Sequence, residues 1–127
     1  MNTYTSTSTY TSPLQSVALG KFLPLESADM YYHTYPSYEC WHGVPNIGKA
    51  DLKDDQMSCW SLAALLNVLP KNLNIGRPSL ESNYEGYYWI QYYDEFMKPN
   101  NYKTKCYDNP INACYEMILK LHELKML

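Results

Sequence analysis

The stretch Tyr84–Tyr93, YEGYYWIQYY, decides the fold that the sequence predicts. Its five Tyr, one Trp and one Ile are residue types favoured in strands. Period two places Tyr88 and Trp89 on opposite faces of this strand, so both faces carry aromatic side chains. Residues 98–101, Lys-Pro-Asn-Asn, are a turn signal. In residues 102–107 the two lysines alternate with Tyr, Thr and Cys, as in a half-buried strand. The pattern therefore predicts an antiparallel hairpin over residues 87–107.

Three helices are predicted outside this hairpin. Residues 12–20 begin with a capping Ser followed by Pro and end at a Gly. Residues 58–69 begin with Ser58 as the expected cap and stop before a Pro, and residues 111–127 follow the cap Asn109. The side chains expected to be buried at helical spacing are Leu14, Val17 and Ala18, then Leu62, Leu65, Leu66 and Leu69, and finally Cys114, Met117, Ile118, Leu121 and Leu124.

The remaining segments complete the predicted architecture. Residues 30–35 are rich in aromatic side chains and predict a strand. Residues 36–56 predict a hairpin and loop region, in which residues 39–42 are the only strand-like piece, and residues 71–83 predict a loop because Gly and Pro interrupt them. The order of elements predicts an α+β fold, a small antiparallel sheet of three to five strands with helices packed on one face. Residues 1–11 contain seven Thr or Ser and predict a disordered tail, which leaves residues 12–127 as a single domain.

Composition narrows the class of protein. Of the 127 residues, 46% are hydrophobic and 18% are charged, which is enough apolar material for a core. The sequence contains no apolar run of the ~18 residues that a membrane span needs, and its first residues lack the pattern of a secretory signal, so we expect a cytoplasmic protein. The net charge is -3 and Arg77 is the only Arg, which disfavours binding to nucleic acid.

The cysteines and histidines suggest two kinds of chemistry, each weighed against simple burial. A metal site would start from Cys40 and His42, whose C-x-H spacing imitates a zinc knuckle only weakly. A thiol nucleophile would be Cys59, because it lies at the start of a predicted helix, where the helix dipole lowers a thiol pKa. The other side chains that could join a metal cluster are His33, Cys59, Cys106 and Cys114. We expect mostly buried, reduced thiols, no enzyme and no cofactor, since the sequence lacks the familiar catalytic motifs.

The aromatic side chains support a different hypothesis, a protein-binding module. Tyr and Trp provide large contact area at low entropic cost, and the chain holds fourteen Tyr. The candidate binding residues are Tyr84, Tyr87, Tyr88, Trp89, Tyr92 and Tyr93. The partner would be an unidentified protein or a second copy of the chain. The sequence leaves two alternatives open: that these rings fill the core, and that Tyr102, Lys103, Lys105 and Tyr107 bind single-stranded nucleic acid.

Three stretches carry a resemblance to a known group of proteins. They are Leu25–Tyr31, LESADMY; Cys59–Leu66, CWSLAALL, ending at Leu69-Pro70; and Asp108–Ala113, DNPINA, which continues into Tyr115-Glu116-Met117. In this order they resemble short proteins of unknown function carried by prophages and other mobile elements of gut Bacteroidales, over nearly the whole chain after the tail. The resemblance implies a phage or mobile-element accessory protein, whose partner would be a host or defence protein. It implies no activity and no site residues.

Overall fold

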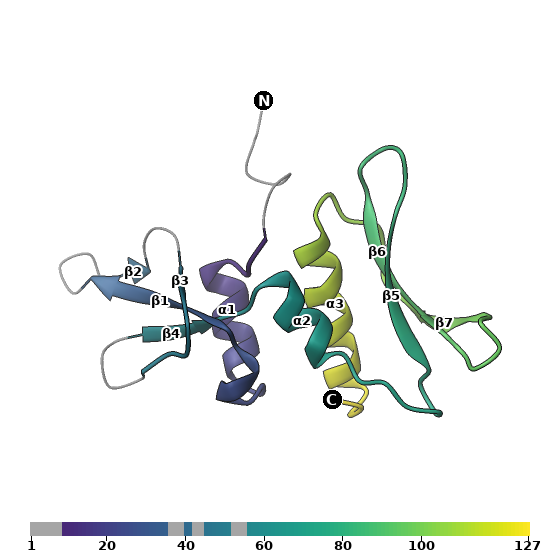
Figure 1. The fold of residues 1–127 in the computed structure, drawn as a ribbon, viewed down its shortest axis with the longest axis horizontal. Helices are drawn as coiled ribbons and strands as arrows, with labels where there is room; N and C mark the ends of the chain where they lie inside the picture. Colours follow the sequence, from purple (N-terminus) through teal and green to yellow (C-terminus); the bar gives the residue numbers. More distant parts are fainter. Residues whose placement is uncertain (1–8, 36–39, 42–44, 52–55) are drawn as a thin grey trace. The chain divides into compact units, whose positions relative to one another are not determined.

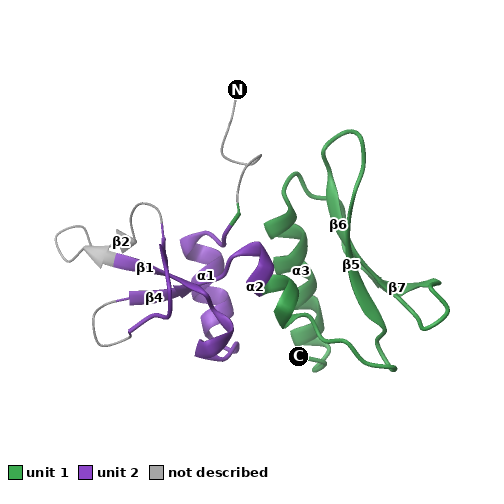
Figure 2. Cartoon of the chain, in the orientation of Figure 1, with its two compact units in different colours: residues 1–9, 65–127 green, residues 10–64 purple. Residues whose placement is uncertain are grey.

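The computed structural model describes residues 9–35, 40–41, 45–51 and 56–127 (Figure 1). Contacts divide the chain into two compact units, coloured separately in Figure 2. We call residues 10–64 the N-terminal unit, and residues 65–127 together with Thr9 the C-terminal unit. This division cuts through the region that the sequence predicts to be one domain over residues 12–127.

The N-terminal unit is built on strand β1. It contains helix α1 (Pro13–Gly20), the short 3-10 helix η1 (Leu25–Ser27) and strands β1 (Met30–Tyr35), β2 (Cys40–Trp41), β3 (Asn46–Ile47) and β4 (Gln56–Cys59). Strands β2, β3 and β4 all pair antiparallel with β1, which makes a four-stranded sheet. Helix α1 packs against β4. The core beneath it includes Leu19, Tyr32 and Trp60, each at most 2% exposed.

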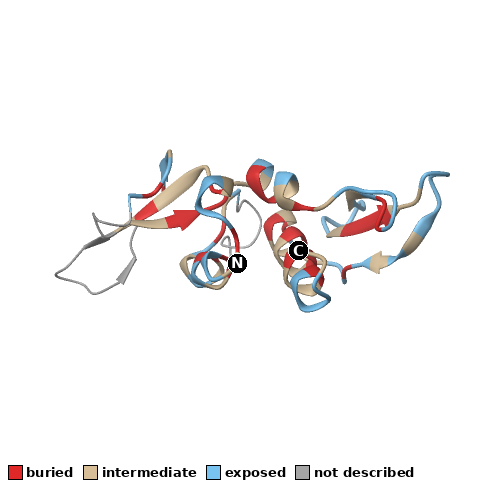
Figure 3. Cartoon of the chain, turned by 90° about the horizontal axis from the view of Figure 1, so that it is seen from below, coloured by how far each residue is buried: buried red, intermediate tan, exposed pale blue. Residues whose placement is uncertain are grey.

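The C-terminal unit is a three-stranded antiparallel sheet covered by one long helix. Strands β5 (Arg77–Ser82), β6 (Tyr88–Tyr93) and β7 (Pro99–Lys103) follow one another in the sheet, with β6 in the middle. Helix α3 (Pro110–Glu123) packs against β6 and β5 and carries a row of buried residues, which are coloured red in Figure 3. Its first turn is capped by Asn109, whose side chain accepts a hydrogen bond from the backbone of Asn112.

The predicted α+β class is confirmed, and each sheet is antiparallel. The strands divide between two sheets, so the expected packing of all helices on one face of a single sheet is not confirmed. The predicted strand over residues 30–35 and the hairpin over 87–107 are present as β1 and as β6 with β7. Strand β5 lies in a segment predicted as a loop, because Gly76 and Pro78 are typical of turns.

The predicted start and cap of the second helix need correction. Helix α2 (Leu62–Val68) begins four residues later than predicted, because Ser58 and Cys59 pair with β1 as part of β4. Its cap is Ser61, whose hydroxyl accepts a hydrogen bond from the backbone of Ala64.

The buried faces of the other helices also differ from the prediction. In α1, Leu14 is 84% and Val17 44% exposed, while Ser16 and Leu19 are buried. In α3 the predicted stripe is confirmed up to Leu121, but Leu124 lies after the helix and is 51% exposed. Residues 1–8 of the predicted tail lie outside the described residues. Tyr10 and Thr11 do not belong to a disordered tail, because Tyr10 forms a bridge with Ser61 and Thr11 is fully buried.

Candidate functional site

The β5–β6–β7 sheet has an inner side that packs on α3. Ile90 and Tyr92 of β6 point to this side, and neither has any exposed surface. The hydroxyl of Tyr92 donates a hydrogen bond to the carbonyl of Pro70 at 2.8 Å, and burial raises the pKa of this hydroxyl. Tyr92 is therefore a core residue, and its prediction as a binding residue is wrong.

The other predicted binding residues lie at different places. Tyr84 and Tyr87 are exposed in and just after the turn between β5 and β6. Tyr88 is half-buried on the inner side, where its backbone exchanges hydrogen bonds with Tyr107 at 2.7 and 2.8 Å. Trp89 and Tyr93 are half-buried on the opposite, outer side of the sheet. The six candidates therefore do not form one surface, although two of them share the outer side of β6.

A carboxylate on the neighbouring strand connects these two aromatic residues. Glu81 of β5 lies opposite Trp89 in the register. Its carboxylate accepts a hydrogen bond from the Trp89 indole Nε1 at 3.1 Å and from the Tyr93 hydroxyl at 2.8 Å. The hydrogen bond to Glu81 raises the pKa of the Tyr93 hydroxyl above its ordinary value. Glu81 thus fixes the orientation of both rings.

Cations lie beside the same rings. The Lys103 ammonium of β7 is 5.8 Å from the centre of the Trp89 ring, within the range of a cation–π interaction. Arg77 of β5 pairs in the register with Tyr93. We call the side formed by Arg77, Glu81, Trp89, Tyr93 and Lys103 the outer face. Arg77 and Glu81 are not among the residues that the sequence predicts for a site, because the sequence pattern does not predict β5.

Gln91 supports the middle of this face. It lies between Trp89 and Tyr93 on β6 and is only 6% exposed. Its side-chain amide donates to the carbonyls of Tyr92 and Asn100, both at 2.8 Å. The register of β6 and β7 shifts between Gln91 and Tyr93, so the amide binds backbone carbonyls where the pairing of the two strands is irregular. Gln91 therefore holds the middle of the outer face in place through hydrogen bonds to the backbone.

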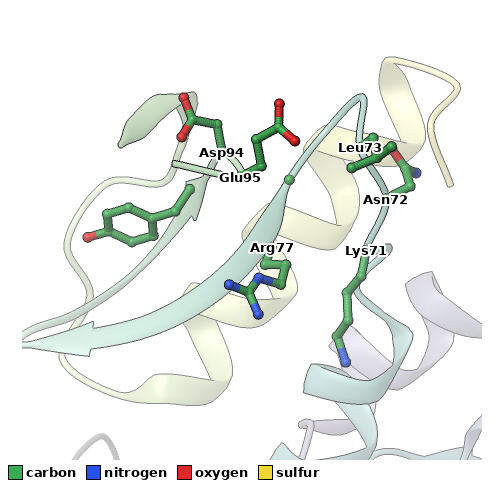
Figure 4. A pocket seen from close by; sticks show the side chains of 8 residues that line it. Lys71, Asn72, Leu73, Arg77, Asp94 and Glu95 are labelled. Atoms are coloured by element: carbon green, nitrogen blue, oxygen red, sulfur yellow. The ribbon is translucent and has the colours of Figure 1, made fainter. Parts of the chain in front are cut away.

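A pocket lies at one end of the outer face, where β5 begins and β6 ends (Figure 4). We call it the end pocket; its cavity is about 360 Å³. It shares Arg77 and Tyr93 with the outer face. The residues that line it are Lys71, Asn72, Leu73, Gly76, Arg77, Tyr93, Asp94 and Glu95. The pocket therefore combines two cations, two carboxylates, a phenol and one apolar side chain.

The thiols give no support to the catalytic and metal hypotheses. Cys59 lies in β4 and is buried, and burial raises its pKa, which keeps the thiol protonated. Burial likewise raises the pKa of Cys114 to about 12, whereas Cys106 is exposed. Within the described ranges, no three His, Cys, Asp or Glu side chains lie close enough to hold a metal ion. His42 and the side chain of Cys40 lie outside the described residues.

The residues proposed for nucleic-acid binding are also separated. Tyr102 is half-buried on the inner side, where its ring meets Tyr92 edge-on at 6.2 Å between centres. Lys103 belongs to the outer face, and Lys105 is exposed beyond the end of β7. These positions therefore do not form a continuous strip of rings and cations.

Comparison with known proteins adds no relative. No family model, no curated protein and no solved structure matches this chain. None of the helices in the described part of the chain has the length and apolar character needed to cross a bilayer.

Proposed function

We propose that this chain is a small protein-binding module that recognises its partner with the outer face. In the context that the sequence resemblance implies, it is an accessory protein of a phage or mobile element, and its partner is a host or defence protein. The observation that carries the proposal is the pairing of Trp89 and Tyr93 with Glu81. The two rings are held on the outer side of a sheet whose inner side already supplies the core.

The composition of the outer face supports recognition of a protein. Trp, Tyr and Arg are the residue types enriched among the strongest contributors to protein interfaces. Because Glu81 and Lys103 already fix the Trp89 ring, binding loses less side-chain entropy than it would with free rings. A nucleic-acid partner is less well supported, because the Glu81 carboxylate lies between the rings and the net charge is -3.

The proposal predicts that Trp89→Ala removes binding without unfolding the protein. The tagged chain is used to capture proteins from a Bacteroidales lysate, and binding of the captured protein is then measured by calorimetry. Because Trp89 is only half-buried, we expect Trp89→Ala to change the free energy of unfolding by about 1 kcal/mol. Loss of a central aromatic contact should weaken association by about 2 kcal/mol or more.

Tyr84→Ala is the matched control, since Tyr84 is an exposed aromatic residue in the same unit but outside the outer face. It should leave binding unchanged. The proposal also covers a second copy of the chain as partner, in which case Trp89→Ala should abolish self-association measured by sedimentation. Equal capture by the wild type and Trp89→Ala would contradict the proposal. Nuclease-sensitive capture would indicate single-stranded nucleic acid instead.

A further inference from the structure

The end pocket holds charges of opposite sign in separate places. Figure 4 shows the carboxylates of Asp94 and Glu95 toward one end and the cationic groups of Lys71 and Arg77 toward the other. Asp94 Oδ1 accepts hydrogen bonds from the backbone of its own turn, at Phe96 and Lys98. The guanidinium of Arg77 lies 3.5 Å from the thioether sulfur of Met97. None of these contacts is with a charge of opposite sign.

The walls of the pocket are held by their own hydrogen bonds. Asn72 Oδ1 accepts from the backbone of Asn74 at 2.9 Å and of Ile75 at 3.0 Å. Gly76 has a φ of +92°, and a Cβ at this position would lie 2.2 Å from the carbonyl oxygen of Tyr93. The loop therefore lies directly on the end of β6. Because both walls are already ordered, a ligand would not have to organise them.

Exposed apolar side chains occur in the pocket and in the turn next to it. Leu73, which lines the pocket, is 89% exposed. Phe96 and Met97 belong to the turn that carries Asp94 and Glu95, and they are 74% and 65% exposed. Large exposed apolar side chains, one in the lining of a pocket and two in the turn that supplies its carboxylates, are typical of an interaction site.

We propose that the end pocket binds an extended peptide segment of the partner, with an acidic and a basic side chain on either side of an apolar one. This inference rests on the proposed function and names the part of the partner that lies beside the outer face. The acidic side chain pairs with Arg77 and Lys71, and the basic one pairs with Glu95. The apolar side chain contacts Leu73. A partner segment of one sign would meet repulsion from half of the pocket, so the charge arrangement selects a segment carrying both.

The test uses blocked peptides and the full chain. The probes are Ac-Gly-Glu-Leu-Lys-Gly-NH2 and Ac-Gly-Lys-Leu-Glu-Gly-NH2, compared with peptides that carry Glu twice or Lys twice, in NMR titrations of the 15N-labelled protein. We expect at least one of the two mixed-charge probes to shift the amide signals of Leu73, Arg77 and Glu95. We expect it to bind at least about threefold more tightly than either like-charged probe. A like-charged probe can form only one of the two charge pairs, and one exposed pair contributes about this factor.

Two pocket variants outside the outer face complete the test. Lys71→Ala and Glu95→Gln should each weaken the better mixed-charge probe by about threefold, whereas Lys105→Ala, another exposed lysine of the same unit, should not. Equal binding of all four peptides, or absence of any shift at the pocket, would overturn the inference. If the pocket fails while Trp89→Ala still abolishes capture of the partner, the proposed function stands and only the peptide site is wrong. If both fail, the proposed function fails as well.

Discussion

Thr11 shows how one buried polar residue ties a segment of unremarkable composition into the fold. Its backbone N–H donates to the carbonyl of Trp60 at 2.9 Å, and its Oγ1 accepts from the Trp60 N–H at 3.1 Å. Its Oγ1 also shares a hydrogen bond with the hydroxyl of Ser16, and its carbonyl accepts from Tyr32. The sequence offers no sign of this role, because five Thr within residues 1–11 look alike and the partners lie far along the chain.

Removing this hydroxyl should destabilise the N-terminal unit. Thr11→Val keeps the shape of the side chain but leaves the buried N–H of Trp60 without its side-chain acceptor. Such an unsatisfied buried donor costs about 1–3 kcal/mol, and we expect a loss of about 2 kcal/mol in the free energy of unfolding measured with urea. Thr9→Val is the matched control, since Thr9 is exposed, and it should change stability by less than about 0.5 kcal/mol. Equal stabilities of the two variants would refute this role of Thr11.

At the level of elements, two turns of the C-terminal sheet are built alike from different residues. In the turn between β5 and β6, Asn83 Oδ1 accepts from the backbone of the residues two and four positions later. In the turn between β6 and β7, Asp94 Oδ1 accepts at the same two positions. The residue three positions after each has a positive φ, +85° at Gly86 and +63° at Met97. Gly adopts this conformation without strain, whereas Met does not.

Exchanging the residue type at these two positions should change stability in opposite directions. Met97→Gly relieves the strained φ and should stabilise the protein by about 1 kcal/mol, while Gly86→Met should destabilise it by about the same amount. A Cβ at Gly86 would meet no atom within 4 Å, so the effect would come from the backbone alone. Thermal unfolding monitored by circular dichroism measures both variants. A Met97→Gly protein less stable than the wild type would contradict the assignment of strain to this turn.

The elements differ in how well the sequence predicts them, and the reason is the range of the interactions that form them. The start of α1 and of α3 follows from local caps, Ser12 and Asn109, and β6 follows from its aromatic alternation. Strand β5 depends on pairing with β6, since its own residues include Pro and two Ser. The end of β4 at Cys59 likewise depends on pairing with β1, and it delays the start of α2. Caps are visible in a sequence, but partner strands are not.

The same limit applies to the candidate site. Alternation correctly separates the two sides of β6, since Tyr88 and Trp89 lie on opposite sides of the strand as predicted. It does not say which side packs on a helix, so it does not separate the core residue Tyr92 from the candidate binding residues. The role of Glu81 depends on the pairing of β5 with β6, which the sequence does not reveal. Its hydrogen bonds with Trp89 and Tyr93 are contacts across strands.

At the scale of the whole molecule, both units bury phenol and thiol groups in their cores. In the N-terminal unit, burial raises the pKa of Tyr32 and of Cys59. In the C-terminal unit, burial raises the pKa of Tyr92 and brings that of Cys114 from 9.0 to about 12. All of these groups are neutral when protonated, so each unit is most stable at a pH where they keep their protons.

These groups predict that the protein loses stability at alkaline pH. A folded state with a raised pKa keeps a proton that the unfolded chain releases, so stability is complete below the unfolded pKa and falls as the pH rises toward the folded one. For Cys114 this window runs from 9.0 to about 12. Between pH 8 and pH 10, ionisation of this thiol in the unfolded chain should lower the free energy of unfolding of the C-terminal unit by about 1 kcal/mol. More stability should be lost above pH 10, where the tyrosines ionise in the unfolded chain.

Urea unfolding at pH 8, 9 and 10, followed through the NMR signals of α3, measures this loss. Cys114→Ala removes the buried thiol, so its free energy of unfolding should fall less over this range, although the variant starts from a lower value because a core atom is missing. Cys106→Ala, which removes an exposed thiol of the same unit, is the matched control, and its loss of stability between pH 8 and pH 10 is compared with that of Cys114→Ala. A Cys114→Ala protein that loses as much stability as the wild type between pH 8 and pH 10 would show that this thiol does not govern the alkaline response. The response would then have to come from other groups, and the buried tyrosines ionise in the unfolded chain only near pH 10.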